Sequence, residues 1–170
     1  SDLDDVRILR ACKIFFDSGF GTPVVFRRKN TDSLISDHSL DVSGIEFVDL
    51  ASLNKERYIS LLFDKRKDKG LSFESAKSLV DDVNYLGVLM VLDGFVDGMV
   101  SGSLSASASV LRPALQLLKK DSVASSYFLM LKEDLVYFFS DCALNIDPSD
   151  VELCDIALCT ASSASSLGIS

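Results

Sequence analysis

The segment from Asp97 to Arg112 carries residue types that bind anions. Gly98 and Gly102 allow a ligand to approach the backbone closely. Short hydroxyl donors recur through the segment at Ser101, Ser103, Ser105, Ser107 and Ser109. Arg112 adds a guanidinium that can hold two oxyanion oxygens at once. Amides, hydroxyls and an arginine together predict a phosphate-binding loop, and the competing interpretation is a flexible connection with a solvated arginine.

The sequence indicates no covalent nucleophile. The single histidine, His38, lies in a polar stretch far from the anion-binding segment, so no Ser/His/Asp or Cys/His arrangement can be assembled around it. The four cysteines show neither a CxxC motif nor a spacing typical of metal ligands. We therefore expect free thiols, no bound metal and a reducing, cytoplasmic setting.

The composition and net charge exclude some classes of binding partner. Hydrophobic residues make up 48% of the 170 residues, which predicts a folded chain with a sizeable core. The net charge of −8 opposes binding to a nucleic-acid backbone or to an anionic membrane surface. The apolar runs are too short to span a membrane. We therefore predict neither a nucleic acid nor a membrane as a partner.

The apolar residues around this segment alternate between strand and helix patterns. Strands are predicted at residues 23–26, 45–48, 99–100, 123–131 and 136–139. Helices are predicted at residues 2–17, 54–67, 84–92 and 149–164, with two more starting at residue 73 and near Pro113, whereas residues 27–43 form a polar connection. This order predicts an α/β fold, a three-layer αβα sandwich around a mainly parallel sheet. In such folds, ligands gather where strand ends meet helix N-termini.

Short sequence words along the chain carry a more specific signal. They are Asp4-Asp5-Val6-Arg7, residues 66–72 (RKDKGLS), 97–102 (DGMVSG), 111–116 (LRPALQ), 125–130 (SSYFLM) and 139–145 (FSDCALN). In this order and approximate spacing, the words resemble the phosphate acetyltransferase family, which includes phosphotransbutyrylases. The resemblance extends over most of the chain.

This resemblance implies an enzyme of acetate metabolism that converts acetyl-CoA and phosphate reversibly into coenzyme A and acetyl phosphate. The family mechanism is direct attack of the coenzyme A thiol on the acetyl phosphate carbonyl, without an acyl-enzyme. Coenzyme A is then a substrate, and no tightly bound cofactor is expected. The resemblance also favours two α/β domains around a cleft and a homodimer. The words do not separate acetyl from butyryl substrates.

Residue roles follow only from matching the family words. Arg112 is expected to bind the phosphoryl group with help from the loop. The helping residues are Ser107, Ser101 and Gly102. Arg66 and Arg7 match family arginines that hold acetyl phosphate or the phosphates of coenzyme A. Each also has a simpler structural explanation, Arg66 as a solvated charge at a helix end and Arg7 as the partner of an acidic helix face.

Departures from the family pattern affect the loop and the base. The family usually carries His and Thr side chains where this sequence has Ser105, Ala106 and Ala108, and His where Asp68 stands. Family members are longer, and the Asp assigned as thiol base lies beyond the part resembled here. We therefore expect residues 1–120 to form a first α/β domain without its first strand and C-terminal return segment, and residues 121–170 to begin a second. On this interpretation the chain is an incomplete fragment, inactive alone, and no catalytic base is assigned within it.

A noncatalytic function remains open beside the enzyme. It would be a phosphotransacetylase-like module that binds an acyl phosphate or coenzyme A, or that mediates assembly. If the chain is a fragment, we expect uncovered sheet edges and an uncovered interdomain face, and therefore a chain that self-associates or is poorly soluble.

Overall fold

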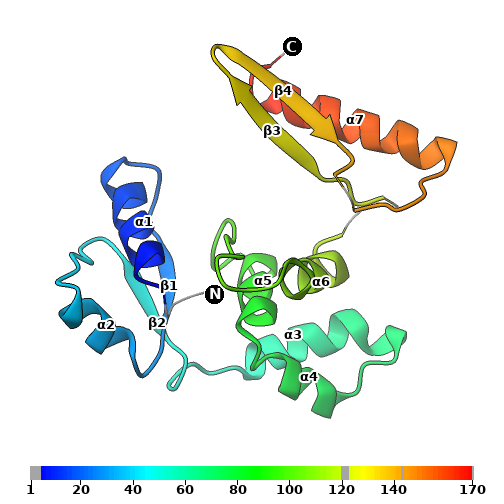
Figure 1. The fold of residues 1–170 in the computed structure, drawn as a ribbon. Helices are drawn as coiled ribbons and strands as arrows, with labels where there is room; N and C mark the ends of the chain where they lie inside the picture. Colours follow the sequence, from blue (N-terminus) through cyan, green and yellow to red (C-terminus); the bar gives the residue numbers. More distant parts are fainter. Residues whose placement is uncertain (1–4, 120–122, 143, 170) are drawn as a thin grey trace. The chain divides into compact units, whose positions relative to one another are not determined.

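The structure, a computed structural model, describes residues 5–119, 123–142 and 144–169. The chain divides into two compact units, Ser1–Leu118 and Lys119–Ser170. Both units combine helices with short strands (Figure 1), so the predicted α/β class is confirmed. None of the described helices has the length and apolar character needed to cross a membrane.

The first unit opens with two helices and a parallel pair of strands. These elements are α1 (Val6–Asp17), β1 (Val24–Arg27), α2 (Thr31–Asp37) and β2 (Glu46–Asp49). β1 and β2 pair in parallel with Val25 opposite Phe47, and both lie where the apolar runs predicted strands. Leu9 of α1 forms a small buried core with Val25 and Ile45. Burial of these side chains holds α1 against the strands.

Helix α2 differs from the sequence prediction, which gave residues 27–43 no element. Its seven residues contain only two apolar side chains, Leu34 and Ile35, which are too few to show helical periodicity. Both pack against the core beside α1, and the Thr31 hydroxyl accepts a hydrogen bond from the Arg28 amide at 2.9 Å. Tertiary packing therefore stabilises a helix that the local sequence does not indicate.

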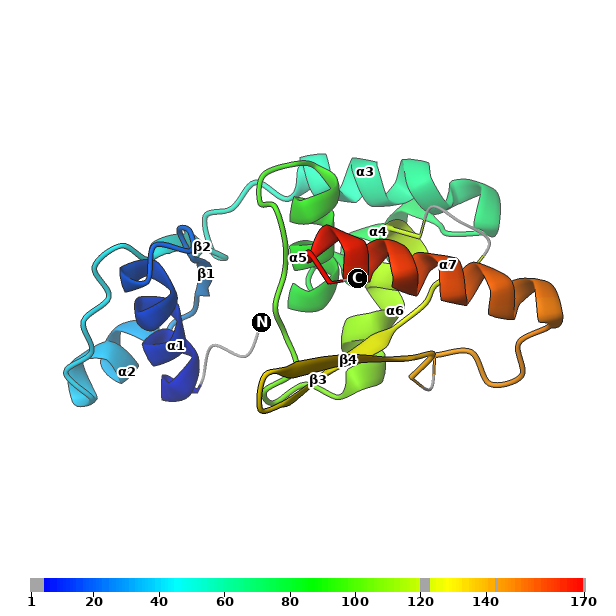
Figure 2. The same cartoon turned by 90° about the horizontal axis from the view of Figure 1, so that it is seen from above.

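The rest of the first unit is helical. These elements are α3 (Glu56–Arg66), the short 3-10 helix η1 (Lys67–Lys69), α4 (Phe73–Leu79), α5 (Val83–Leu92) and α6 (Ser107–Leu117). As predicted, Ser72 caps α4, and Gly70 ends the preceding turn with φ +83°. Helix α5 contacts both α3 and α6, and its residues 84–90 are all buried. A helix buried on every side forms the centre of this core (Figures 1 and 2).

After α5 the chain turns back and runs antiparallel beside that helix (green in Figure 2). Met99 packs over Gly87, where an added Cβ would lie 2.7 Å from the Met99 Sδ atom. Ser101 then reaches Asn84 near the start of the helix. The strand predicted at residues 99–100 is therefore wrong, because this stretch lies against a helix and pairs with no described strand.

The second unit is a β-hairpin with one helix beside it. Its elements are β3 (Tyr127–Lys132), β4 (Leu135–Ser140) and α7 (Asp150–Ser166). The two strands are antiparallel. Only Glu133 and Asp134 connect them, and such a short link cannot form a parallel crossover. The predicted parallel pairing therefore holds for β1 and β2 but not for this pair, whereas α7 begins with the predicted capping box of Ser149 and Glu152.

Most of this hairpin is exposed to solvent. All residues of β3 are exposed, including Phe128 at 61% and Leu131 at 71%. Helix α7 packs beside β4 (Figure 1), and the Thr160 hydroxyl donates a hydrogen bond to Ser140 Oγ at 2.8 Å. Of the α7 side chains, only Ile156 is buried. Within the described part of this unit, a large apolar surface is therefore left uncovered.

Gly44 tests how closely α1 is packed. Its backbone has φ +80°, and an added Cβ would overlap the Phe16 ring. A strained backbone alone costs about 1–3 kcal/mol, and we expect Gly44→Ala to destabilise the chain by more than this. Gly19→Ala, at φ +73° with open space around it, is the matched control for the backbone cost. Urea unfolding measures both variants, and equal losses in free energy of unfolding would contradict the packing.

The uncovered hairpin predicts self-association of the chain at high concentration. Leu131→Lys should weaken that association, because a charge on an open strand disfavours pairing with another strand. Ile146→Lys, at a residue that is 99% exposed and outside the hairpin, is the matched control. Light scattering over a concentration series measures the mass, and a monodisperse monomer for the unchanged chain would refute the prediction.

Candidate anion-binding site

The predicted phosphate-binding loop is the connection between α5 and α6, and a buried asparagine anchors it to α5. Ser101 Oγ donates a hydrogen bond to Asn84 Oδ1 at 3.0 Å. Asn84 is only 5% exposed, and its backbone amide donates to the N-cap carboxylate of Asp82 at 2.7 Å. A polar side chain this deep needs a partner, because an unpaired one costs desolvation free energy. The Ser101 hydroxyl is that partner, so the loop is held at the start of α5.

A second anchor ties the same loop to α1. Ser103 Oγ donates a hydrogen bond to Asp5 Oδ2 at 2.8 Å, across 98 positions of sequence. Asp5 is the N-cap residue of α1, and its Oδ1 accepts from the Arg7 amide at 2.9 Å. The loop is therefore fixed at two serines, one bonded to the start of α5 and the other to the start of α1.

Arg7, one of the predicted site residues, is held by that same carboxylate. Its Nε lies 2.9 Å from both Asp5 oxygens, and its Nη2 lies 2.5 Å from Oδ2. The Asp5 side chain is 8% exposed and the Arg7 side chain 72%. Hydrogen bonds from Arg7, and then from Ser103, hold the pKa of Asp5 well below its usual range, while the carboxylate raises the pKa of Arg7. Arg7 thus has an acidic partner, as its simpler explanation required. That partner is the N-cap residue of α1, and it also binds the loop.

Helix α6 carries two more of the predicted site residues, Ser107 and Arg112. Ser107 is its first residue, and both Ser107 and Arg112 are exposed. The opposite side of α6 is buried at Pro113 and Leu117. Within the described residues, no hydrogen bond or ion pair engages the Arg112 guanidinium, which leaves it available to an anion. Pro113 lies inside α6 rather than near its start, because the helix begins at Ser107.

A hydrogen bond between α5 and α6 adds to the packing of these helices. The Tyr85 hydroxyl donates to Gln116 Oε1 at 2.9 Å, and Tyr85 is buried. Gln116 closes the same sequence word that contains Arg112. The helix that carries Arg112 is thus bonded to α5 at a residue one turn after Arg112.

Arg66 stands apart from this arrangement. It is the last residue of α3, is half-buried, and makes no hydrogen bond or ion pair through its guanidinium with the described part of the chain. Its backbone carbonyl accepts from the Leu71 amide at 3.2 Å. The structure therefore links Arg7, through Asp5, to the loop that contains Ser101 and leads to Arg112. Arg66 remains a prediction from the family words.

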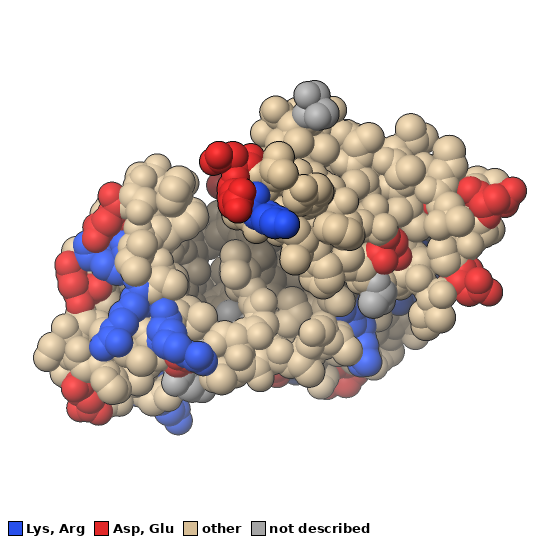
Figure 3. Space-filling view, turned by 45° about the horizontal axis from the view of Figure 1, so that its top comes forward, with Lys and Arg blue, Asp and Glu red and all other residues tan. Residues whose placement is uncertain are grey.

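Some other cations of the first unit pair with acids. Arg27 pairs with Asp32, and Lys13 pairs with Asp17. On the face drawn in Figure 3, acidic and basic side chains lie close together at the left, and uncharged residues cover most of the rest. Arg112 differs from these paired cations in having no acidic partner among the described residues.

The second unit contains an acidic turn and an open hollow. Asp141 accepts hydrogen bonds from the Asn145 amide at 2.7 Å and from Ser126 Oγ at 3.1 Å. Burial raises the pKa of Asp141, but the hydrogen bonds from Asn145 and Ser126 outweigh burial and hold that pKa below its ordinary value. Because Ser126 turns towards Asp141, β3 begins at Tyr127 rather than at residue 123. A carboxylate bonded in this way shapes a turn.

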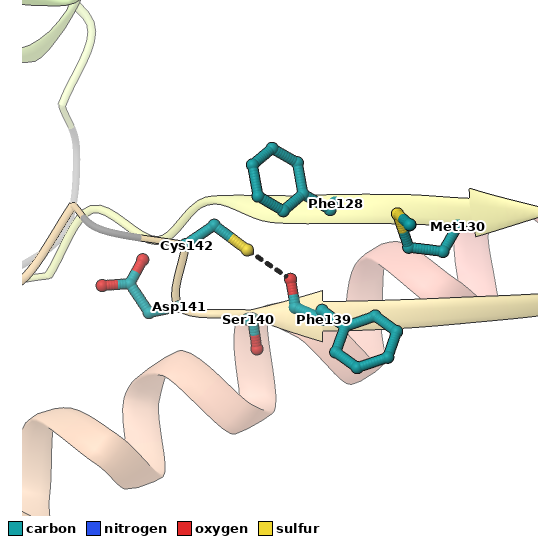
Figure 4. Close-up of a pocket in the computed structure, with 6 residues that line it drawn as sticks. All are labelled: Phe128, Met130, Phe139, Ser140, Asp141 and Cys142. Atoms are coloured by element: carbon teal, nitrogen blue, oxygen red, sulfur yellow. Dashed lines mark hydrogen bonds between the residues drawn. The ribbon is translucent and has the colours of Figure 1, made fainter.

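The hollow beside this turn has a volume of about 450 Å³. It is lined by Phe128, Met130, Phe139, Ser140, Asp141 and Cys142. In Figure 4 the Cys142 thiol points to the Phe139 carbonyl oxygen, at an Sγ to oxygen distance of 2.9 Å. The thiol is therefore engaged with backbone, and no basic side chain lines the hollow to activate it. All four cysteines are free, and within the described ranges no cluster of His, Cys, Asp or Glu could hold a metal ion.

Comparison with known proteins decides the family. The sequence matches the family described as phosphate acetyl/butaryl transferase over residues 1–170. The phosphate acetyltransferase of Staphylococcus epidermidis is 36% identical over 171 residues, which cover 98% of this chain and 52% of that protein. This chain belongs to the phosphate acetyl/butaryl transferase family. The phosphate acetyltransferase of Escherichia coli is 35% identical over 98% of this chain, but only 24% of that protein is covered.

Solved structures of the phosphate acetyl/butaryl transferase family agree in fold. The EutD phosphotransacetylase from Staphylococcus aureus is similar with a TM-score of 0.86 and 34% identity, over 99% of this chain and 52% of that one. A phosphotransacetylase from Streptococcus pyogenes gives the same TM-score at 32% identity. The chain thus spans about half the length of these structures and of the S. epidermidis relative.

The sequence analysis missed two residues of the candidate anion-binding site, Asn84 and Asp5. Asn84 carries a signal that could have been used, because a polar residue within the apolar run of α5 must find a partner if the helix is buried. Asp5 stands in the same sequence word as Arg7, yet nothing local shows that its carboxylate also reaches Ser103. Such a long-range contact depends on the fold.

The Asp5 pairing predicts an acid-dependent loss of stability. Because the folded-state pKa of Asp5 lies below its unfolded value of about 3.9, the carboxylate stabilises the fold above that pH and ceases to do so as the pH falls through the acid range. We expect the free energy of unfolding of the unchanged chain to exceed that of Asp5→Asn at neutral pH, and the difference to shrink below about pH 4. Urea unfolding at a series of pH values measures this. A difference that does not change with pH would show that the charge of Asp5 is not what stabilises.

Proposed function

We propose that this protein catalyses reversible transfer of an acetyl group between coenzyme A and phosphate. In the direction of acetyl-CoA formation, the thiol sulfur bonds to the carbonyl carbon of acetyl phosphate, the bond from that carbon to the phosphate oxygen breaks, and phosphate leaves. The thiol proton passes to a base. Membership of the family, and relatives named phosphate acetyltransferase, support this reaction. We further propose that the protein is cytoplasmic and forms a homodimer.

The observation that carries the proposal is the exposed Arg112 on α6, the helix that follows the anchored loop. Its guanidinium can hold two phosphoryl oxygens, and the Ser107 hydroxyl and the first amides of α6 can hold others. Positive charge at this place neutralises the phosphate as it leaves, which lowers the barrier to acyl transfer. Arg7 supports the same site, because two of its nitrogens bind Asp5 and Nη1 has no bond to a described residue.

The predicted serines differ in what they can offer an anion. Ser101 gives its hydroxyl proton to Asn84, so that proton is not available to a ligand while the bond lasts. Ser107 has no such bond to a described residue. We therefore propose Ser107 as a hydroxyl donor to the phosphoryl group, and Ser101 and Gly102 as backbone contributors.

The base for the thiol is not assigned to a described residue. Asp141 is occupied by hydrogen bonds from Ser126 and Asn145, and Asp97 is an exposed residue of the turn after α5. On this proposal the described residues bind and orient phosphate and acetyl phosphate. Coenzyme A acts as a substrate.

Arg112→Ala tests the proposal. In the product of the intact gene, we expect the change to raise the half-saturating concentration of phosphate or acetyl phosphate and to lower kcat, with about 2–4 kcal/mol of transition-state binding lost. In the 170-residue chain, calorimetry with inorganic phosphate should show weaker binding. Arg112→Lys should recover part of the loss, since a lysine keeps the charge but not the two-pronged geometry.

Arg10→Ala, at an exposed arginine on α1, is the matched control and should leave both measurements unchanged. Unchanged kinetics in Arg112→Ala would overturn the assignment of Arg112. If the gene product binds phosphate through Arg112 but forms no acetyl phosphate from acetyl-CoA, it is the noncatalytic binding module. The reduced set of side-chain donors at Ser105, Ala106 and Ala108 is the observation that favours this second candidate.

A further inference from the structure

We propose that Asp5 is a positioning residue that aligns Arg7 with the phosphate-binding loop, so that both face the same anion. The inference rests on the function proposed above. Asp5 itself does not touch the ligand. It acts through the two groups that its carboxylate holds, the Arg7 guanidinium and the Ser103 hydroxyl.

The carboxylate is built into the structure rather than free to move. Its side chain is 8% exposed, and each oxygen accepts more than one hydrogen bond. The Arg7 amide and Nε lie 2.9 Å from Oδ1, while Nη2 of Arg7 and Oγ of Ser103 lie 2.5 and 2.8 Å from Oδ2. Because a single side chain receives all of these donors, the position of Arg7 and the position of the loop cannot vary independently.

Arg7 needs such a partner if it is to act on an anion. Without a partner, an arginine that is 72% exposed on the first turn of a helix would sample many rotamers, and ordering it on a ligand would cost conformational entropy. The Asp5 pair fixes Nε and Nη2, and Nη1 then points away from the carboxylate because the guanidinium is planar. The entropy is thus lost on folding rather than on binding, which is the general basis of preorganisation.

The loop needs the contact for a separate reason. Gly102 lies between the two anchoring serines with φ +117°, a conformation that glycine adopts easily, so the backbone there is not fixed by its own preferences. Ser101 is bonded to α5 and Ser103 to α1. Removing the second bond leaves the first intact, so Ser103→Ala would free the side of the loop near Arg7 without unfolding α5.

A purely structural role for Asp5, as the cap of α1, makes different predictions. A lost cap lowers the stability of the helix, and phosphate affinity would follow only through unfolding. Ser103→Ala leaves the cap bond to the Arg7 amide and the ion pair in place, so it separates loop alignment from helix capping.

The experiment measures inorganic phosphate binding to the 170-residue chain by calorimetry, together with the melting temperature of each variant. We expect Ser103→Ala and Asp5→Asn each to raise the dissociation constant by about tenfold, and Ser103→Ala to lower the melting temperature less than Asp5→Asn does, because it removes only one hydrogen bond to the carboxylate. Ser103→Thr, which keeps the hydroxyl, should restore affinity. Arg7→Ala combined with Asp5→Asn should weaken binding by less than the product of the two single effects, because part of the Asp5 effect passes through Arg7 and the rest passes through Ser103. Ser33→Ala, which removes a serine hydroxyl bonded to Asn30 O on α2, is the matched control.

The outcomes separate this inference from the proposed function. If the unchanged chain binds phosphate, Arg112→Ala weakens that binding, and Ser103→Ala and Asp5→Asn bind as tightly as the unchanged chain, then the positioning role is wrong and the function stands. If the unchanged chain binds no phosphate, or binds it without dependence on Arg112, then the proposed function fails and the positioning role fails with it. Failure of Ser103→Thr to restore affinity would also overturn the role assigned to the hydroxyl.

Discussion

Burial of helix α5 is the constraint on which the first unit depends. Residues 84–90 of this helix are all removed from solvent, so its neighbours α3 and α6 must cover it on several sides. Most of these side chains are apolar and gain free energy by burial. Asn84 is the exception, and its buried amide group requires a polar partner. The need to satisfy Asn84 is what draws the loop against the helix, and the loop in turn leads into the helix that carries Arg112.

Within that loop, the structure divides the polar groups by direction. The Ser101 and Ser103 hydroxyl protons point inward, to Asn84 and Asp5. Arg112 is directed outward on the exposed side of α6. A loop composed of small polar residues can therefore be rigid, because the hydroxyls that look like ligands in the sequence also serve as anchors. The resulting site binds with a few well-placed groups rather than with many mobile ones.

Elements with a strong local pattern could be predicted from the sequence. The strands β1 and β2 and the capped starts of α4 and α7 were all predicted, since apolar runs and capping residues are local signals. Helix α2 could not be predicted, because its stability comes from packing of Leu34 and Ile35 on a core assembled from distant segments. The same reason explains Met99, where an apolar pair that looks like a strand end packs on a helix instead. The family words gave Arg7 and Arg112, but the link from Arg7 through Asp5 to Ser103 spans most of the first unit and has no local signal.

The contact of Met99 with Gly87 has a consequence for how the site can change. The distance between the loop and α5 depends on glycine at position 87, because an added Cβ there would lie 2.7 Å from the Met99 Sδ atom and 3.3 Å from its Cε atom. Met99 has a flexible side chain that can yield by shifting its end, and its shift would be passed to the backbone two residues before Ser101. The spacing of the ligand groups can thus be adjusted from inside the core, by a residue that never meets the ligand. Substitutions in the core beneath the loop can therefore change substrate preference, as substitutions of the residues that contact the ligand can.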